Sequence, residues 1–240
     1  MTCAWCKALS NQPEDSGSPE VELYESGRDQ FIGLVGALAD SDADTLVPIT
    51  PGWTIREVTA HLCGLNADIA SGMRTNLGTD ERTAYQVEVR RSDSVAAICD
   101  EWVSYGDVVR DVFEPEPMFA RRLASDLAVH LHDVQHALGL PVDSTDALSV
   151  NGGLTYAELT PPRLLDGFGI CLRIELDGQA SFGPEDCELV VRASPYDFLR
   201  SVTGRRSRTQ VLNLDWEGSP EQVLDHLCPY GPLRSSDAEI

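Results

Sequence analysis

The sequence predicts an α+β protein in which a four-helix bundle precedes a small α+β domain. Before residue 141 the apolar residues recur with helical spacing. Gly139 followed by Pro141 is a usual signal for the end of a helix. Beyond residue 166, short aliphatic and β-branched runs are typical of strands. We therefore expect the following division of the chain: a disordered N-terminal tail over 1–19, the bundle over 20–141, the α+β domain over 147–232 and a second tail over 233–240.

Four segments of the first part show the apolar spacing of amphipathic helices. They are residues 21–40, 54–73, 94–113 and 118–138, and the polar residues 76–93 read as a loop. Thr54 and Glu57 form the pattern of a capping box, in which a hydroxyl and a carboxylate satisfy free N–H groups at a helix start. Pro115 and Pro117 separate the third helix from the fourth. Four helices joined by connections of mixed length favour a four-helix bundle.

The second part mixes strands with short helices. Strands are expected over residues 167–176, 187–192 and 210–216, which are rich in aliphatic residues. The segments SPYDFLRSVTG and SPEQVLDHL each begin with Ser-Pro, an N-cap followed by proline in the first helical position. This mixture indicates a small α+β domain.

The charge of the chain excludes some classes of partner. Its 39 acidic and 18 basic residues give a net charge of −21, which opposes binding to nucleic acid and to anionic membranes. It contains no run of about 18 apolar residues that would cross a membrane. The N-terminal segment lacks the basic stretch and long apolar core of a secretory signal. We expect a cytoplasmic protein.

Cysteine spacing argues against a disulfide framework, because the seven cysteines are odd in number and irregularly placed. Cys3 and Cys6 form a C-x-x-C pair, but no second pair follows to complete a structural zinc site. Their thiols are either incidental or serve a redox or accessory metal role.

The segment LASDLAVHLHDVQHALG, residues 123–139, carries the candidate chemistry. Asp126 and His130 are four residues apart and therefore share one helix face. His61, on the second predicted helix, offers a third ligand. Bundles build metal sites from an i, i+4 pair on one helix and a ligand from another, and two histidines with one carboxylate suit catalytic zinc with an open fourth position. The alternative is a surface salt bridge between Asp126 and His130 without a metal.

Neighbouring residues receive simpler interpretations. We expect His132 and His136 to be exposed. Asp133 is either a partner that orients a ligating imidazole or an ordinary surface acid. Cys63 is expected to pack as a small apolar residue.

Two motifs indicate a family. PGWTIREVTAHLCG and SDLAVHLHDVQHALGLP together resemble mycothiol-dependent maleylpyruvate isomerases, and the resemblance extends over about residues 20–232. It implies a DinB-like four-helix bundle with a small α+β domain, and zinc held by His61, Asp126 and His130. The family has Glu where this chain has Asp126, which shortens the reach by about 1.5 Å. The helix must sit closer to the metal, or a water must intervene.

The resemblance also implies a mechanism. Zinc would hold the sulfur of mycothiol as a thiolate, which attacks an electrophilic carbon of a second substrate. Arg205, in the pair Gly204-Arg205, would hold a carboxylate; Arg206 is the neighbouring alternative. Without the resemblance, Arg205 reads equally well as a cation at a helix C-terminus.

The expected function is therefore a zinc-assisted, mycothiol-dependent thiol transferase or isomerase acting on a small electrophilic metabolite. Its partners would be the small-molecule thiol and the substrate, with no nucleic acid and no membrane. The alternative is a non-catalytic binding or regulatory protein that keeps the scaffold with a weak or lost metal site.

Overall fold

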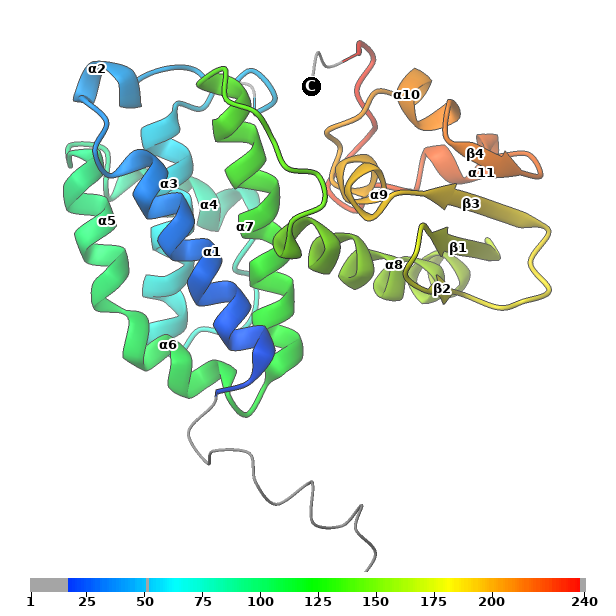
Figure 1. Cartoon of the computed structure of the whole chain (residues 1–240), viewed down its shortest axis with the longest axis horizontal. Helices are drawn as coiled ribbons and strands as arrows, with labels where there is room; N and C mark the ends of the chain where they lie inside the picture. The colour runs from blue at the N-terminus through cyan, green and yellow to red at the C-terminus, as the bar shows by residue number, and fades with distance from the viewer. Residues whose placement is uncertain (1–16, 51, 238–240) are drawn as a thin grey trace, which may run out of the picture.

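The computed structural model describes residues 17–50 and 52–237. Its first half is a bundle of long helices that lie side by side (Figure 1). These are α1 (Pro19–Val35), α3 (Ile55–Ala70), α5 (Val95–Ser104) with α6 (Gly106–Phe113), and α7 (Pro117–Ala137). The short helices α2 (Asp40–Ala43) and α4 (Asp80–Glu88) connect them. The predicted four-helix bundle is confirmed, with α5 and α6 in the place of one third helix.

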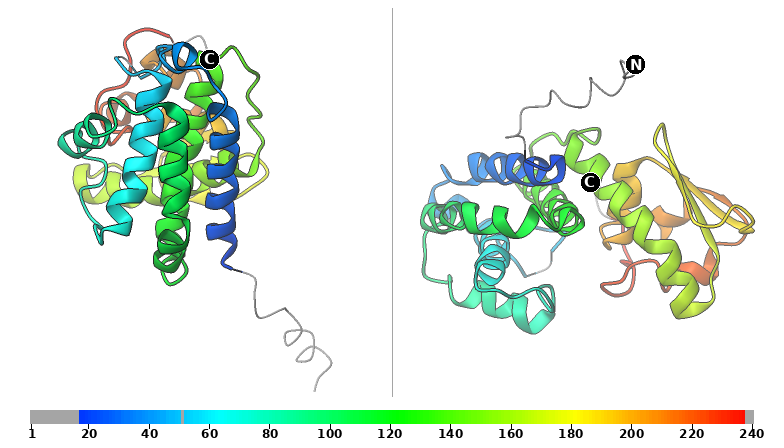
Figure 2. Two further views of the ribbon diagram at one scale, coloured as in Figure 1. Left: turned by 90° about the vertical axis from the view of Figure 1, so that its left-hand side faces the viewer. Right: turned by 90° about the horizontal axis from the view of Figure 1, so that it is seen from below.

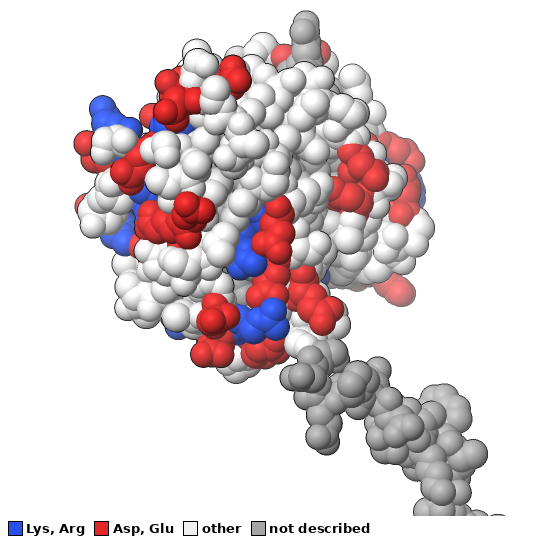
Figure 3. All heavy atoms as spheres, turned by 60° about the vertical axis from the view of Figure 1, so that its left-hand side comes forward, with Lys and Arg blue, Asp and Glu red and all other residues white. Residues whose placement is uncertain are grey.

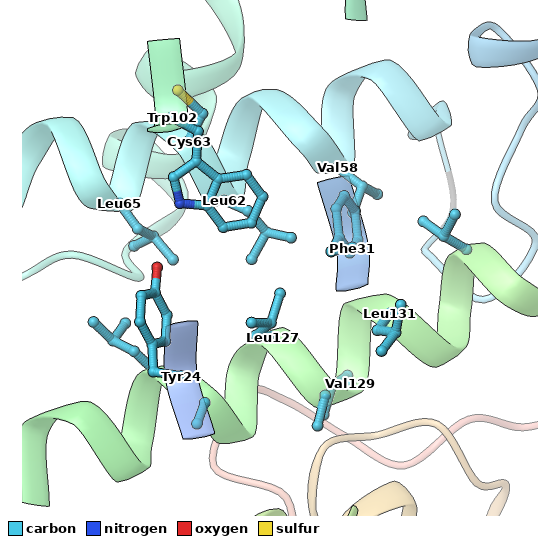
Figure 4. Close-up of a cluster of buried hydrophobic side chains, with 14 of the residues drawn as sticks. Tyr24, Phe31, Val58, Leu62, Cys63, Leu65, Trp102, Leu127, Val129 and Leu131 are labelled. Atoms are coloured by element: carbon cyan, nitrogen blue, oxygen red, sulfur yellow. The ribbon is translucent and has the colours of Figure 1, made fainter. Parts of the chain in front are cut away.

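The core of the bundle consists of large side chains that meet between the four helices (Figure 4). The rings of Phe31 and Trp102 lie 5.7 Å apart, and Leu127 and Leu131 on α7 are fully buried. Burying one such side chain contributes about 1.5–3 kcal/mol. This packing holds α3 and α7 in the fixed relation on which the candidate site depends.

The local signals at the ends of α3 and α7 act as expected. Thr54 and Glu57 form the capping box of α3. Helix α7 ends just before Gly139, which adopts the left-handed conformation at φ 67°. Both helices are therefore bounded where the sequence predicted, within a few residues.

Residues 76–93 were wrongly predicted as a loop, because they contain helix α4. The only buried residue of this helix is polar, Gln86, so no apolar period marks it. Its start is visible in retrospect, since the side chain of Thr79 accepts a hydrogen bond from the backbone N–H of Arg82.

The second half packs helices against one face of a four-stranded sheet. Its strands are β1 (Leu172–Leu176), β2 (Ser181–Phe182), β3 (Leu189–Ala193) and β4 (Asp215–Glu217), in the order β2-β1-β3-β4. The pair β1 and β3 is parallel and the other pairs are antiparallel. Helices α8 (Ala147–Phe168), α9 (Pro195–Val202), α10 (Arg208–Leu212) and α11 (Glu221–Leu224) complete it. The predicted α+β fold class is confirmed.

Helix α8, which the sequence reading did not anticipate, joins the halves. It packs on α7 at one end and reaches the sheet at the other (Figures 1 and 2). Pro161 and Pro162 inside it and Gly152-Gly153 near its start hide its helical pattern. A larger residue would not fit in place of Gly153, because a Cβ there would lie 2.4 Å from the carbonyl oxygen of Pro195. They let α8 and α9 approach closely.

Two further local predictions differ from the structure. Residues 210–216 were predicted as a strand, but they form the end of α10 and the start of β4. Ser194 caps α9 as expected, whereas Ser219 does not cap α11; its hydroxyl donates to Glu221 instead.

Cysteine pairing was also misjudged, because Cys171 and Cys187 form a disulfide. They stand just before β1 and β3, and the parallel pairing of these strands brings them together. Cys63, Cys99 and Cys228 are free and buried, as expected for Cys63. Cys3 and Cys6 lie outside the described residues.

The surface of the helical half carries many more acidic than basic groups on the face shown in Figure 3. Within residues 17–50 and 52–237, no helix has both the length and the apolar content needed to cross a membrane.

Candidate active site

A cleft of about 680 Å³ opens between the bundle and the second half of the chain. Its walls come from α3, α4, α7 and α8, from the turn after α9, and from residues 229–230. His61, Asp126, His130, Tyr156 and Arg205 all line it. The four residues proposed from the sequence as site residues therefore share one cavity.

The ligating atoms of His61, Asp126 and His130 all lie within 4.8 Å of one another. The Nε2 atom of His61 is 3.7 Å from Asp126 Oδ2, and that of His130 is 3.7 Å from Asp126 Oδ1. These separations are too long for direct hydrogen bonds. They are close to the roughly 3.3–3.6 Å expected between two ligands of a tetrahedral zinc ion with bonds of about 2.0–2.2 Å.

The shorter Asp side chain still reaches the two imidazoles, since its two oxygens face one nitrogen each. The imidazoles are buried, at 5% exposed for His61 and 6% for His130. Trp53, next to the capping box of α3, covers them; its ring centroid is 5.4 Å from that of His61 and 6.4 Å from that of His130. The cluster therefore combines two buried imidazoles with a carboxylate whose side chain is 36% exposed.

The protonation states match those of metal ligands. Burial lowers the pKa of His130 to about 4, so this imidazole is neutral at pH 7. Burial alone would raise the pKa of Asp126, but the facing His130 and His61 lower it to about 2, so the carboxylate is ionised. Its buried Oδ2 finds no hydrogen-bond partner among the described residues. A cation bound between these three groups would satisfy that oxygen, so the residues fit a zinc ion.

Asp133 is fully buried, so its interpretation as a surface acid is wrong. Its Oδ1 accepts from Arg200 Nη1 at 2.7 Å, and its Oδ2 accepts from Arg205 Nη2 at 3.0 Å. Oδ2 also lies 3.7 Å from His130 Nδ1, on the side of the ring away from Asp126. This separation is too long for a direct hydrogen bond, and Nδ1 of His130 has no hydrogen-bond partner among the described residues.

Arg205 enters the cleft from the turn after α9. Gly204 makes this turn at φ 75°, a conformation that favours glycine. The guanidinium is held by Asp133 and by the carbonyl oxygen of Thr203, 2.7 Å from Nη1. Arg206, the neighbouring alternative, instead pairs with Asp197 at 3.0 Å.

Several residues around the site could not be found from the sequence. Gln86 contacts His61, Arg200 contacts Asp133, and the hydroxyls of Tyr156 and Tyr230 lie 2.5 Å apart in the cleft wall. In each of these pairs the two residues are at least 25 positions apart along the chain, so no local spacing predicts the contact.

The histidines that were expected to be exposed are not. His132 is fully buried, with Nε2 3.3 Å from Ser149 Oγ and 3.8 Å from Asp146. His136 is partly buried. Helix α8 packs against α7, and Tyr196 of α9 lies against the ring of His132, so this face of α7 is covered.

Comparison with known proteins gives one family and two solved structures. Residues 24–114 match the model of the mycothiol maleylpyruvate isomerase N-terminal domain. The crystal structure of the mycothiol-dependent maleylpyruvate isomerase is 17% identical, with a TM-score of 0.49 over 84% of this chain and 94% of that one. A histidine-to-alanine mutant of that enzyme gives 16% identity and a TM-score of 0.48 over the same shares. No curated protein sequence matches the chain. The match over residues 24–114 is to the family that the motifs of the sequence resemble.

Proposed function

We propose that this protein is a zinc-assisted, mycothiol-dependent thiol transferase or isomerase that acts on a small electrophilic, carboxylated metabolite. The observation that carries the proposal is the convergence of His61, Asp126 and His130 in one cleft with Arg205. The family of residues 24–114 supports the thiol, and a volume of about 680 Å³ admits a thiol together with a small substrate. The cytoplasmic location stays a prediction.

His61, Asp126 and His130 would hold Zn²⁺, which when bound favours the thiolate form of a coordinated thiol. All three side chains line the cleft, in which the thiol would bind. Asp133, 3.7 Å from Nδ1 of His130, would place a negative charge beside that ring. Trp53 and Phe119 line the cleft and exclude water from the reacting groups.

Arg205 would bind a carboxylate of the substrate and place its electrophilic carbon beside the sulfur. A guanidinium suits this role because it offers two parallel N–H donors to the two carboxylate oxygens. In an isomerase the sulfur adds to a double bond, the former double bond rotates as a single bond, and the sulfur leaves again. In a transferase the carbon–sulfur bond remains, and the neighbouring carbon takes up a proton from water.

The first test is the metal content of the purified protein beside Asp126→Ala and His130→Ala. We expect about one zinc per chain in the wild type, and its loss in both variants. The matched control is His136→Ala, which removes an imidazole from the same helix outside the cleft and should keep the zinc. A metal-free wild type that takes up no added zinc would overturn the proposal and favour the non-catalytic binding protein.

The second test is turnover of maleylpyruvate and related unsaturated acids with mycothiol. Arg205→Met should keep the zinc and raise the KM for a carboxylated substrate about 10–100-fold, the loss expected for one hydrogen-bonded charged contact. Zinc-loaded wild type without any thiol-dependent turnover would contradict the enzymatic role.

A further inference from the structure

Gln86 reaches the metal site from α4 without entering the ligand set. Its Oε1 lies 2.8 Å from Nδ1 of His61, and the side chain is 1% exposed. The approach of α4 to α3 depends on Gly64, because a Cβ there would lie 2.5 Å from the Cβ of Gln86. The contact is thus built into the packing of two helices.

The orientation of the Gln86 amide is decided by Asp68, one turn before the end of α3. The carboxylate of Asp68 is 4% exposed, and its Oδ2 lies 2.7 Å from Gln86 Nε2. Arg82 binds the same carboxylate, with Nε 2.7 Å from Oδ2 and Nη2 on Oδ1. An ionised carboxylate only accepts hydrogen bonds, so the amide must turn its NH₂ group to Asp68. The carbonyl oxygen of Leu77, 3.3 Å from Nε2, favours the same orientation.

The orientation of the Gln86 amide determines the tautomer of His61. With the amide oxygen facing it, Nδ1 of His61 must carry the proton, and Nε2 of the neutral ring then holds the lone pair. That Nε2 points at the site, 3.7 Å from Asp126 Oδ2. A metal binds an imidazole through its unprotonated nitrogen, so this tautomer is the ligating one.

We propose that Gln86, oriented by Asp68 and Arg82, is a positioning residue that holds His61 in the Nδ1–H tautomer and so presents Nε2 as the metal ligand. The metal part of this inference rests on the proposed function, whereas the tautomer is a property of the metal-free protein. The two imidazoles thus differ, because Nδ1 of His61 is hydrogen-bonded to an amide oxygen whereas Nδ1 of His130 lies 3.7 Å from Asp133 and has no hydrogen-bond partner among the described residues.

The experiment has two readouts, neither of which is activity. Nitrogen-15 NMR of the ring of His61 in metal-free protein reports the tautomer, and competition with a chelator gives the zinc dissociation constant. We expect a single Nδ1–H tautomer in the wild type. In Gln86→Leu we expect a mixture of tautomers and a dissociation constant raised about 10–100-fold.

Two variants keep the test sharp. Asn66→Leu is the matched control, because it removes a buried amide from α3, the helix of His61, that bonds Tyr24 and the Leu62 carbonyl and not His61. It should destabilise the fold and leave zinc affinity unchanged. Asp68→Asn frees the Gln86 amide to turn over, and should mix the tautomers with a smaller loss of affinity, up to about tenfold.

An Nε2–H tautomer in metal-free wild type would overturn the inference. So would a Gln86→Leu variant that binds zinc as tightly as Asn66→Leu. A wild type that binds no zinc but shows the Nδ1–H tautomer, lost in Gln86→Leu, would support the role of Gln86 and overturn the proposed function instead.

Discussion

We expect Asp133→Asn to destabilise the protein far more than Arg200→Met, although the two residues form one ion pair. Both side chains are fully buried where α9 packs against the helical half. Arg200 Nη1 donates to Asp133 Oδ1 at 2.7 Å and lies 3.2 Å from the carbonyl oxygen of Val129. Its Nε and Nη2 have no hydrogen-bond partner among the described residues. Asp133 is therefore the one described carboxylate that balances the charge of Arg200.

The two substitutions differ in cost because only one of them leaves a fully buried charged group without a partner. Removing the charge of Asp133 leaves the guanidinium of Arg200 buried and uncompensated, which costs about 3–5 kcal/mol. Removing Arg200 leaves Asp133 paired with Arg205, 3.0 Å away. The loss is then one hydrogen bond to a charged group, about 1.5–3 kcal/mol, partly offset by the apolar methionine.

The assay is urea unfolding at pH 7 for the wild type, both single variants and the double variant. A chelator is kept in all samples, because a metal that binds only the folded state would add its own stabilisation. The double variant should be more stable than Asp133→Asn alone, since it removes the fully buried guanidinium of Arg200 and leaves only Arg205, which is 16% exposed, without its carboxylate. A cost below about 1 kcal/mol for Asp133→Asn, or a larger cost for Arg200→Met, would refute this account of the buried cluster.

Three more outcomes are expected. Burial alone would raise the pKa of Glu101, but the hydrogen bonds from Arg90 lower it, so the stability that Glu101 contributes is present above its unfolded pKa of about 4.3 and is lost as the pH falls. Glu101→Gln should therefore lower the free energy of unfolding by about 1–3 kcal/mol at pH 7 and by less at pH 3, as urea unfolding at both pH values would show. Gly153→Ala forces a Cβ against the backbone of α9 and should lower the free energy of unfolding by about 1–3 kcal/mol, as measured by thermal unfolding. Gly33→Ala is the control and should cost nothing, because no atom lies within 4 Å of its new Cβ. Equal melting temperatures of the two variants would contradict the close approach of α8 and α9. Burial raises the pKa of Cys63 to about 12, so peptide mapping after alkylation at pH 8 should find Cys63 unmodified in the native protein and modified after denaturation; rapid native labelling would mean that the thiol is accessible.

The sequence by itself determined the features that depend on neighbours along the chain. The apolar spacing and the capping box at Thr54 placed α3, and the Gly139 stop ended α7, because helix ends are closed by residues within one turn. The spacing of four between Asp126 and His130 put both ligands on one face for the same reason. With His61 added by the second helix and the family resemblance, these local signals were enough to name three residues that lie together in one cleft.

Only the tertiary structure decided what surrounds that site. Gln86 sits on a helix whose single buried residue is polar, so no hydrophobic period could reveal it. His132 and Asp133 are buried because α8 and α9, formed by later parts of the chain, cover α7. Arg200 and Asp133 meet across 67 positions. Such contacts form only when whole helices and strands pack together. The pattern of a few neighbouring residues does not predict which distant element will pack against them.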